Sequence, residues 1–301
     1  MKRRRSLTHV GGATRTTGDA RIAAKLAEAL EVAPAPEPAR PKPSVAPEGA
    51  PRKDDADDDP DRVHVHGFHT YPARMHPATA ARLVRAASSE GSLVLDPFAG
   101  SGTVLVEAMA AGRRAAGTDL NPLAVRLASL KTARLDAATR AAVVEGARAA
   151  AVFADDRRQR RAGATRRYPP EDMASFDAHV LLELDSLRAA VEGMESAPVR
   201  AALELVLSAI LVKLSRRTSD TASGTNARTA RRLAAGYPSR LFIRKAEELG
   251  ARVAAFEALL PSVAQVPPAK VTLDDASRLA TIGPGTVDAV VTSPPYVATY
   301  D

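Results

Sequence analysis

The sequence TSPPY, residues 292–296, directly follows the apolar run 289–291, which favours a strand. Two consecutive prolines fix the backbone φ angle and remove two amide donors, so a carbonyl near Ser293 can face a pocket as a rigid acceptor. Ser293 adds a hydroxyl acceptor, and Tyr296 adds an aromatic face. The exocyclic amine of a planar base complements these groups, because its N–H groups donate and its ring stacks. The same residues also fit an ordinary turn at the end of a strand.

Glycines after an earlier predicted strand indicate where a second molecule binds. The sequence VLDPFAGSGT, residues 94–103, places Gly100 and Gly102 between a strand and a helix, where a ligand can approach the bare backbone. Asp119 ends the next predicted strand, 19 residues after Gly100, where an acid can accept hydrogen bonds from ribose hydroxyls. Together these features favour a nucleoside cofactor, although the third glycine of a dinucleotide-binding motif is absent.

Alternating strands and helices must position these groups. Strands are predicted at 92–96 and 115–120, and helices are predicted at 76–89, 103–112 and 122–135. This order is typical of an α/β fold with a parallel sheet. Residues 136–260 have helical periodicity, with the clearest helices at 175–194, 198–215 and 238–260. Strands resume at 269–275 and 286–293. A helical insertion is therefore expected to interrupt the sheet.

The first 60 residues differ in composition from the rest of the chain. A short helix is predicted near residues 19–33, followed by a proline-rich stretch and the acidic run 54–61. Dense proline favours extended solvated chain, and like charges repel one another. We expect a disordered tail and linker at 1–60, a cofactor-binding half at 61–135, the basic helical insertion at 136–265 and the catalytic-motif strand region at 266–301.

Composition narrows the class of protein further. The chain of 301 residues has no cysteine, which removes disulfides, thiolate metal sites and a cysteine nucleophile. No stretch has the roughly 20 apolar residues that span a bilayer, so a cytoplasmic location is expected. The formal net charge is +7, of which residues 131–265 carry +6. This basic segment suits a polyanion such as nucleic acid, or it reflects arginines on solvated helix faces.

Four histidines, His64, His66, His69 and His76, lie close together in the sequence. Metal ligation is conceivable, but the carboxylate and cysteine partners of a recognisable site are missing from the motif. We expect packing and hydrogen bonding around Tyr71 and Pro72 and no bound metal.

These motifs resemble those of the S-adenosylmethionine-dependent DNA amino methyltransferases, the cytosine-N4 and adenine-N6 class of restriction-modification systems. DPFAGSGT is similar to the cofactor motif of that family, GTDLNP to its ribose-binding strand end, and TSPPY to its catalytic motif, in the serine form associated with cytosine. FHTYPARMHP resembles the segment before its first strand, and KLSRRTSDT resembles a stretch in its relatives. The resemblance covers residues 64–134, about 213–250, and 270–301.

The resemblance implies a Rossmann-like methyltransferase fold and a set of site residues. S-adenosylmethionine is the implied cofactor, and the positions that match its binding motifs are Tyr71, Asp96, Phe98, Gly100, Gly102, Thr103 and Asp119. The sequence LDDASRL, residues 273–279, lies where the family places an acid near the cofactor adenine, which implies Asp275 as a further cofactor-binding residue. The implied catalytic residues are Ser293, Pro294, Pro295 and Tyr296. In such enzymes the amine attacks the sulfonium methyl directly. The lack of cysteine separately excludes carbon-5 methylation of cytosine, which needs a cysteine nucleophile.

Double-stranded DNA is the implied partner. Its target base must be flipped out of the duplex, at a cost of a few kcal/mol that contacts to DNA must offset. The insertion is expected to supply phosphate contacts, and the candidate residues are Arg216, Arg217, Arg228, Arg231 and Arg232. Each of these arginines could equally lie on a solvated surface.

Family members continue the sheet with about three more strands after the catalytic motif. Here VATYD follows Tyr296, so we expect either a piece of a longer protein or a second chain that supplies the missing C-terminal strands. Three alternatives to a cytosine-N4 DNA methyltransferase stay open at this point. They are an adenine-N6 DNA methyltransferase, an RNA amino methyltransferase, and a non-catalytic fragment or subunit that binds cofactor or DNA.

Overall fold

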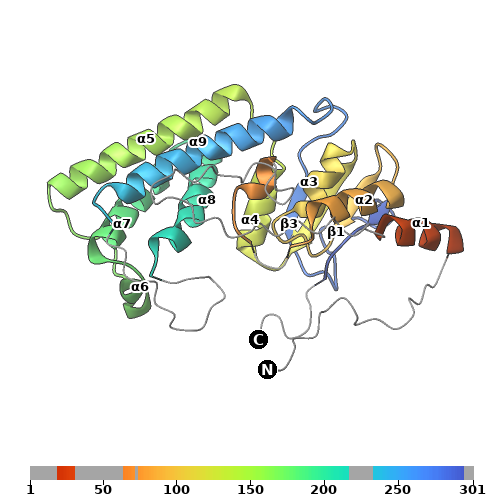
Figure 1. Cartoon of the computed structure of the whole chain (residues 1–301), viewed down its shortest axis with the longest axis horizontal. Helices are drawn as coiled ribbons and strands as arrows, with labels where there is room; N and C mark the ends of the chain where they lie inside the picture. The colour runs from red at the N-terminus through yellow and green to blue at the C-terminus, as the bar shows by residue number, and fades with distance from the viewer. Residues whose placement is uncertain (1–18, 31–63, 72–73, 217–232, 295–301) are drawn as a thin grey trace, which may run out of the picture.

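A four-stranded parallel sheet lies beside a layer of helices (Figure 1). The computed structural model describes residues 19–30, 64–71, 74–216 and 233–294. The strand order is β3-β2-β1-β4, and the bounds are β1 Leu93–Asp96, β2 Arg114–Asp119, β3 Lys270–Leu273 and β4 Ala289–Val290. All three pairings are parallel. The predicted α/β fold with a Rossmann-like sheet is thus confirmed.

Four helices accompany the sheet: α1 Ala20–Leu30, α2 Pro77–Ala87, α3 Thr103–Ala110 and α4 Pro122–Lys131. α3 connects β1 to β2, and α4 follows β2 and packs against β2 and β3. The chain moves from β1 to β2 and then to β3 in the same direction across the sheet. Right-handed crossovers therefore place α3 and α4 on the same face of the sheet. α2 packs on α3, and α1 packs on α2.

Local sequence signals begin these helices. Asn121 precedes Pro122, and its Oδ1 accepts a hydrogen bond of 2.9 Å from the Leu123 amide at the start of α4. His76 acts in the same way for α2, where its Nδ1 accepts from the Ala78 amide at 3.2 Å. Each cap satisfies an amide that the first helical turn leaves without an intrahelical partner.

Gly102 is required where the β1 loop enters α3. Its φ angle is +85°, and a β-carbon built there would lie 3.0 Å from both Cα and Cβ of Ala128 in α4. We expect Gly102→Ala to lower the free energy of unfolding by about 2–4 kcal/mol, because it combines backbone strain with an overpacked contact. Urea unfolding measures this change.

Gly91→Ala is the matched control for that substitution. Gly91 has a φ angle of +78°, yet nothing lies within 4 Å of a β-carbon built there. Its substitution should therefore report backbone strain alone, about 1 kcal/mol. Equal losses in the two variants would show that the close approach of α3 and α4 does not depend on glycine.

Five of the described helices form a layer beside the sheet. They are α5 Ala137–Gln159, α6 Pro170–Ser175, α7 Ala178–Glu192, α8 Ala197–Leu214 and α9 Tyr237–Glu257. Figure 1 shows α5 and α9 running side by side along this layer, and α5 also packs against α7 and α8. α7, α8 and α9 coincide with the clearest helices predicted from periodicity. α5, with 23 residues the longest described helix, was expected only as part of the helical segment.

The helical layer and the sheet share one continuous core. Leu105 of α3, Leu127 of α4, Leu203 of α8 and Phe242 of α9 belong to the same buried cluster. The helical layer lies within the predicted boundaries 136–265. Because the core is shared, the division of the chain into separate domains stays a prediction.

Polar contacts reinforce this junction. The guanidinium of Arg134, after α4, makes three hydrogen bonds of 2.7–2.9 Å to the carboxylate of Glu257 at the end of α9. It also donates to the carbonyl oxygens of Val266 and Pro261, at 2.6 Å and 2.9 Å. Such a bidentate pair fixes orientation as well as distance. It holds the end of the helical layer beside the segment that leads into β3.

β4 lies at one edge of the described sheet. Asp288 begins its pairing with β1, because its amide donates to the Leu93 carbonyl at 3.0 Å and its Oδ2 accepts from the Leu93 amide at 2.6 Å. The Val291 amide continues the ladder to the Leu95 carbonyl at 3.0 Å. Val290 is 57% exposed. The segment after β4 is therefore aligned with the end of β1. There the loop of residues 97–102 begins, which we call the glycine loop.

Among the helices that the structure describes, none combines the length and the apolar character needed to cross a bilayer.

Candidate cofactor and base site

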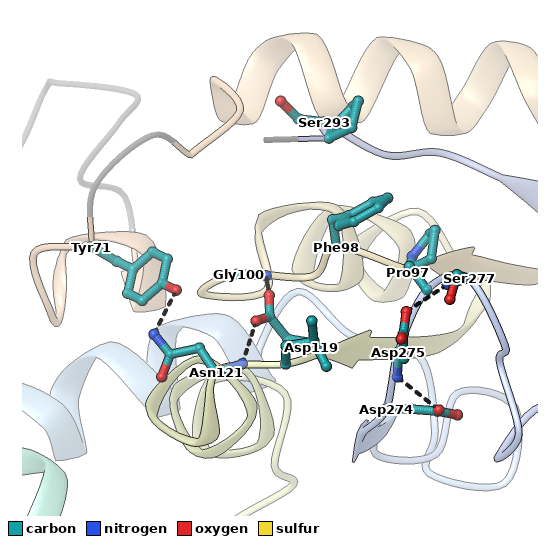
Figure 2. A pocket seen from close by; sticks show the side chains of 13 residues that line it. Tyr71, Pro97, Phe98, Gly100, Asp119, Asn121, Asp274, Asp275, Ser277 and Ser293 are labelled. Atoms are coloured by element: carbon teal, nitrogen blue, oxygen red, sulfur yellow. Dashed lines mark hydrogen bonds between the residues drawn. The ribbon is translucent and has the colours of Figure 1, made fainter. Parts of the chain in front are cut away.

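A cavity of about 440 Å³ lies at the C-terminal ends of all four strands. β1 is flanked by β2 on one side and by β4 on the other, so the strand order reverses at β1. Open α/β sheets bind ligands at such a topological switch point. Figure 2 shows the lining residues converging from separate segments. They are Tyr71, Pro97, Phe98, Gly100, Asp119, Leu120, Asn121, Asp274, Asp275, Ala276, Ser277, Ser293 and Pro294.

Asp119 is held in place by two backbone amides. Its Oδ2 accepts from the Gly100 amide and its Oδ1 accepts from the Asn121 amide, both at 2.8 Å (Figure 2). Each carboxylate oxygen can accept a second hydrogen bond. The carboxylate therefore links the glycine loop to the start of α4 and still offers acceptors to a diol such as ribose.

Tyr71 packs over the glycine loop. A β-carbon at Gly100, whose φ angle is +50°, would lie 3.4 Å from Cε1 of the Tyr71 ring. The Tyr71 hydroxyl accepts a hydrogen bond of 3.3 Å from Nδ2 of Asn121. Figure 2 shows Tyr71 and Phe98 on opposite sides of Gly100. The loop thus carries an aromatic group on each side, which suits the planar and apolar parts of a nucleoside.

Asp96 lies beneath this loop rather than on the larger cavity. It is 3% exposed, and its Oδ1 accepts from the Phe98 amide at 3.1 Å and from the Thr292 hydroxyl at 2.6 Å. Burial raises the pKa of the Asp96 carboxyl to about 6, although both hydrogen bonds favour its charged form. Asp96 therefore connects the glycine loop with the segment that precedes Ser293.

The raised pKa of Asp96 predicts a pH dependence of stability. The folded protein keeps this proton at a pH where the unfolded chain, with an ordinary value of 3.8, has lost it. The resulting stabilisation is complete below about pH 4 and is lost as the pH rises through 6. In the wild type the free energy of unfolding should therefore fall by up to about 3 kcal/mol over this pH range. Asp96→Asn should remove this fall, because asparagine keeps an acceptor oxygen but does not ionise. Urea unfolding between about pH 4 and 7 measures it, and an unchanged decline in the variant would contradict the assignment.

A second, smaller cavity of about 30 Å³ adjoins the first. Tyr71, Phe98, Gly100 and Ser293 line both cavities, and the smaller one adds Arg74, Met75, Asp96, Ala99, Ser101, Thr103 and Val104. The hydroxyls of Ser101 and Thr103 are buried and have no hydrogen-bond partner within the described part of the chain. Buried hydroxyls without partners are unusual, so a polar ligand group at this point would satisfy them.

Asp274 and Asp275 close the larger cavity on the β3 side. Asp274 is used within the loop, since its Oδ2 accepts from the amide and hydroxyl of Thr281, both at 2.7 Å. Asp275 accepts from the Ser277 amide at 2.8 Å, and this hydrogen bond is the main reason that the pKa of its carboxyl is lowered. Asp275 therefore presents a charged carboxylate to the cavity at neutral pH.

The predicted site residues are largely brought together. Tyr71, Phe98, Gly100, Asp119, Asp275, Ser293 and Pro294 line the larger cavity, and Asp96 and Thr103 line the smaller one. Gly102 lines neither cavity and packs against Ala128 instead. Pro295 and Tyr296 lie outside the described residues. The roles of all these residues stay predictions.

The predicted DNA-binding arginines are mostly outside the described part of the chain, namely Arg217, Arg228, Arg231 and Arg232. Arg216 is described, and its Nη2 lies 2.5 Å from Oδ1 of Asp177. A guanidinium held by a carboxylate is less available to a phosphate. Arg216 as a phosphate contact stays a prediction.

His64 and His66 of the histidine cluster lie in η3 (His64–Gly67), which packs against α9. His66 Nε2 lies 2.8 Å from Oε1 of Glu107, and the His64 ring stacks on Phe256 at 5.2 Å. Donor atoms of His64, His66 and Glu107 lie within 4.8 Å of one another. Burial is the main cause that lowers the pKa of both histidines, that of His64 to about 4. The absence of a metal at this cluster stays a prediction.

Thr292, Asn121 and Ser277 are site residues that sequence reasoning missed. Asn121 and Thr292 lie inside the quoted motifs GTDLNP and TSPPY, and that was the available signal. Their partners, Tyr71 for Asn121 and Asp96 for Thr292, are 50 and 196 residues away along the chain. Ser277 lies two residues after Asp275, a predicted cofactor-binding residue, and this proximity was a comparable signal.

The chain has a Rossmann-like α/β fold with a cavity at its topological switch point. A DNA methylase family matches residues 46–130 of the chain. The type II methyltransferase M.MjaII of Methanocaldococcus jannaschii is 34% identical over 73 residues, which cover 24% of this chain and 14% of that protein. The type II methyltransferase M.MvaI of Kocuria varians is 40% identical over 75 residues, which cover 24% of this chain and 16% of that protein. No solved structure matches.

These matches confirm the predicted resemblance to the DNA amino methyltransferases of restriction-modification systems. The match to the family extends through β1, α3, β2 and most of α4. It therefore includes Tyr71, the glycine loop and Asp119. The matches to the two relatives span only a small part of the length of each.

Proposed function

We propose that the chain provides the cofactor-binding and base-binding parts of a DNA methyltransferase that modifies an exocyclic amine, with cytosine N4 as the favoured target. The observation that carries this proposal is the shared cavity of Asp119, Gly100 and Ser293. These residues come from three separate predicted motifs. Their convergence supports a site in which a methyl donor and an acceptor base lie together.

DNA methyltransferases of the matching family use S-adenosylmethionine as their methyl donor. When bound, it supplies an electrophilic methyl group on a sulfonium centre. The two adjoining cavities fit S-adenosylmethionine. The larger one offers a fixed carboxylate at Asp119 and a bare backbone at Gly100, and the smaller one offers buried hydroxyls at Ser101 and Thr103 that have no hydrogen-bond partner among the described residues. In our proposal Asp119 accepts from the ribose hydroxyls, and Tyr71 and Phe98 pack beside the ligand.

Ser293 and Pro294 form the part of the cavity that we assign to the base. Pro294 has no backbone N–H group and cannot donate a hydrogen bond. The neighbouring carbonyl groups can therefore accept from the base without competition from an adjacent amide. The Ser293 hydroxyl accepts a hydrogen bond from the amine, and this bond strengthens as positive charge develops on the nitrogen during transfer. These residues orient the amine and so provide catalysis by positioning.

Methyl transfer from radiolabelled S-adenosylmethionine tests the proposal. The protein is incubated with unmodified duplex DNA, and nucleoside analysis then distinguishes N4-methylcytosine from N6-methyladenine. We expect label in N4-methylcytosine, and Ser293→Ala should lower the rate without changing cofactor affinity. Label in N6-methyladenine would correct the target base. Label in RNA but not in DNA would overturn the proposed substrate, and cofactor binding without transfer to either would support a non-catalytic subunit.

A further inference from the structure

The C-terminal end of α5 and the loop after it are unusually rich in arginine. Between Asp155 and Arg167 the sequence contains six arginines and two aspartates, a formal charge of +4. Figure 1 shows α5 extending to the end of the helical layer that is remote from the sheet. With 23 residues, α5 is about 34 Å long. This charge is therefore well separated from the cofactor cavity.

Among the described residues, carboxylates pair with two of these six arginines. Arg158 pairs with Asp155, and Arg160 pairs with Asp156 at 3.0 Å. Within the described residues, no carboxylate lies within 4.0 Å of the other four, Arg157, Arg161, Arg166 and Arg167. We call these four residues the arginine patch.

A cavity of about 270 Å³ opens between α5 and α7 at this patch. Arg157, Arg158 and Arg161 line it together with His179 and Ser186 of α7, among others. Neutral groups fix the Arg157 side chain, whose Nε donates to the Ser186 hydroxyl at 3.1 Å and whose Nη2 donates to the Gly163 carbonyl at 2.6 Å. These hydrogen bonds orient the Arg157 guanidinium, and because both acceptors are neutral they leave its positive charge unpaired by a carboxylate.

Among the described residues that line this cavity, Glu183 is the one with a carboxylate, and that carboxylate already accepts hydrogen bonds from other donors. Glu183 is 5% exposed, and its Oε1 accepts from the amide and hydroxyl of Ser239 at 2.9 Å and 2.6 Å. Its Oε2 accepts from the Gly236 amide at 2.9 Å. Because these three donors satisfy the carboxylate from the α9 side, it does not form an ion pair with the arginine patch.

Helix stability explains only part of this charge. Arg157 lies in the last turn of α5, where a cation interacts favourably with the helix dipole. Arg166 and Arg167 lie seven and eight residues after the end of the helix, beyond the reach of that effect. Both are exposed. A guanidinium presents planar donors that match phosphate oxygens, and exposed guanidiniums without acidic partners are typical of phosphate-binding surfaces.

We infer that the arginine patch binds backbone phosphates of duplex DNA away from the base that is methylated. This inference rests on the proposed function, which supplies DNA as the polyanion. Phosphate contacts carry no sequence information but set the position of a protein on the duplex. The patch therefore contributes affinity and position, and the base is selected elsewhere.

The double variant Arg161→Gln/Arg167→Gln tests this inference. Binding to a duplex of about 40 base pairs is measured by fluorescence anisotropy over a range of salt concentrations, at a length that spans both sites at 3.4 Å per base pair. We expect affinity to fall about tenfold, and the slope of log K against log salt to become shallower by about 2, because two phosphate contacts are lost. Cofactor affinity, measured by calorimetry, and helix content, measured by circular dichroism, should not change.

Arg82→Gln/Arg85→Gln is the matched control, because it removes two exposed arginines from α2. It should change DNA affinity less than twofold. Equal losses in the two double variants would show a general effect of net charge and would overturn the inference. Wild-type affinity and slope in Arg161→Gln/Arg167→Gln would overturn it as well.

Methyl transfer by the unmodified protein separates this inference from the proposed function. Failure to methylate DNA would reject the proposed function, while the binding comparison would still decide whether the arginine patch contacts DNA. Methylation of DNA with unchanged binding by the variant would reject the arginine patch alone. If the double variant kept its affinity for DNA but lost affinity for an acidic protein, the arginine patch would bind a protein partner. That result would also overturn the inference.

Discussion

Asp119→Ala is expected to weaken S-adenosylmethionine binding by about 100-fold, while leaving the affinity for DNA within about twofold of the wild type. The carboxylate accepts from the amides of Gly100 and Asn121, both at 2.8 Å, and in our proposal it also accepts from the ribose. Its removal therefore loses the ligand contact and also releases the glycine loop. Isothermal titration calorimetry with the cofactor measures the effect.

Two further variants sharpen this experiment. Asp119→Asn keeps one acceptor oxygen but supplies no charge, so its cofactor affinity should fall between those of the wild type and Asp119→Ala. Glu145→Ala removes an exposed acid of α5 and should leave cofactor affinity unchanged. If Asp119→Ala bound the cofactor as tightly as the wild type, Asp119 could not be the ribose acceptor.

The core βαβα order could be predicted because its local signals agree with one another. The glycine loop, the Asn121 cap and Pro122 each lie at a boundary between elements, and the apolar periodicity changes at the same points. α5 was harder to single out, because its buried face consists mainly of small residues such as Ala147, Ala150 and Ala154. Alanines support a helix at many positions but give little contrast between its buried and exposed faces.

β4 shows the limit of strand prediction from composition. Residues 286–293 were expected to form a strand, whereas the structure assigns only Ala289–Val290. The pairing of β4 with β1 begins at Asp288, whose side chain accepts a hydrogen bond from the Leu93 amide. It ends at Thr292, whose hydroxyl donates to Asp96. Side-chain hydrogen bonds to a distant strand thus set both ends, and a sequence pattern does not contain them.

The arrangement of charges could not be predicted for the same reason. The excess of arginine in residues 131–265 was evident, but its distribution between paired and unpaired side chains was not. Arg216 pairs with Asp177, which is 39 residues earlier in the chain, while Arg161 has no carboxylate near it among the described residues. The packing of α5, α6 and α7 decides which guanidiniums pair with a carboxylate and which stay available to a phosphate.

Thr292→Val is expected to lower kcat for methyl transfer by about 100-fold while changing cofactor affinity less than about threefold. Valine keeps the shape of threonine but removes the hydroxyl that donates to Asp96 at 2.6 Å. Thr292 directly precedes Ser293, so this hydrogen bond sets the position of the proposed base site relative to the glycine loop. Single-turnover kinetics together with calorimetry separate the two effects.

Thr292→Ser provides the matched control, because it restores the hydroxyl and should bring kcat to within about threefold of the wild type. A pH titration distinguishes positioning from a general loss of packing. The hydrogen bond from Thr292 lowers the pKa of Asp96 against the effect of burial, so its removal should move the pH-dependent loss of stability above pH 6. If Thr292→Val kept the wild-type kcat while its stability profile moved in this way, the hydrogen bond would stabilise the fold without positioning Ser293. Ser293 would then depend for its position on the β4 pairing to Leu95 rather than on Asp96.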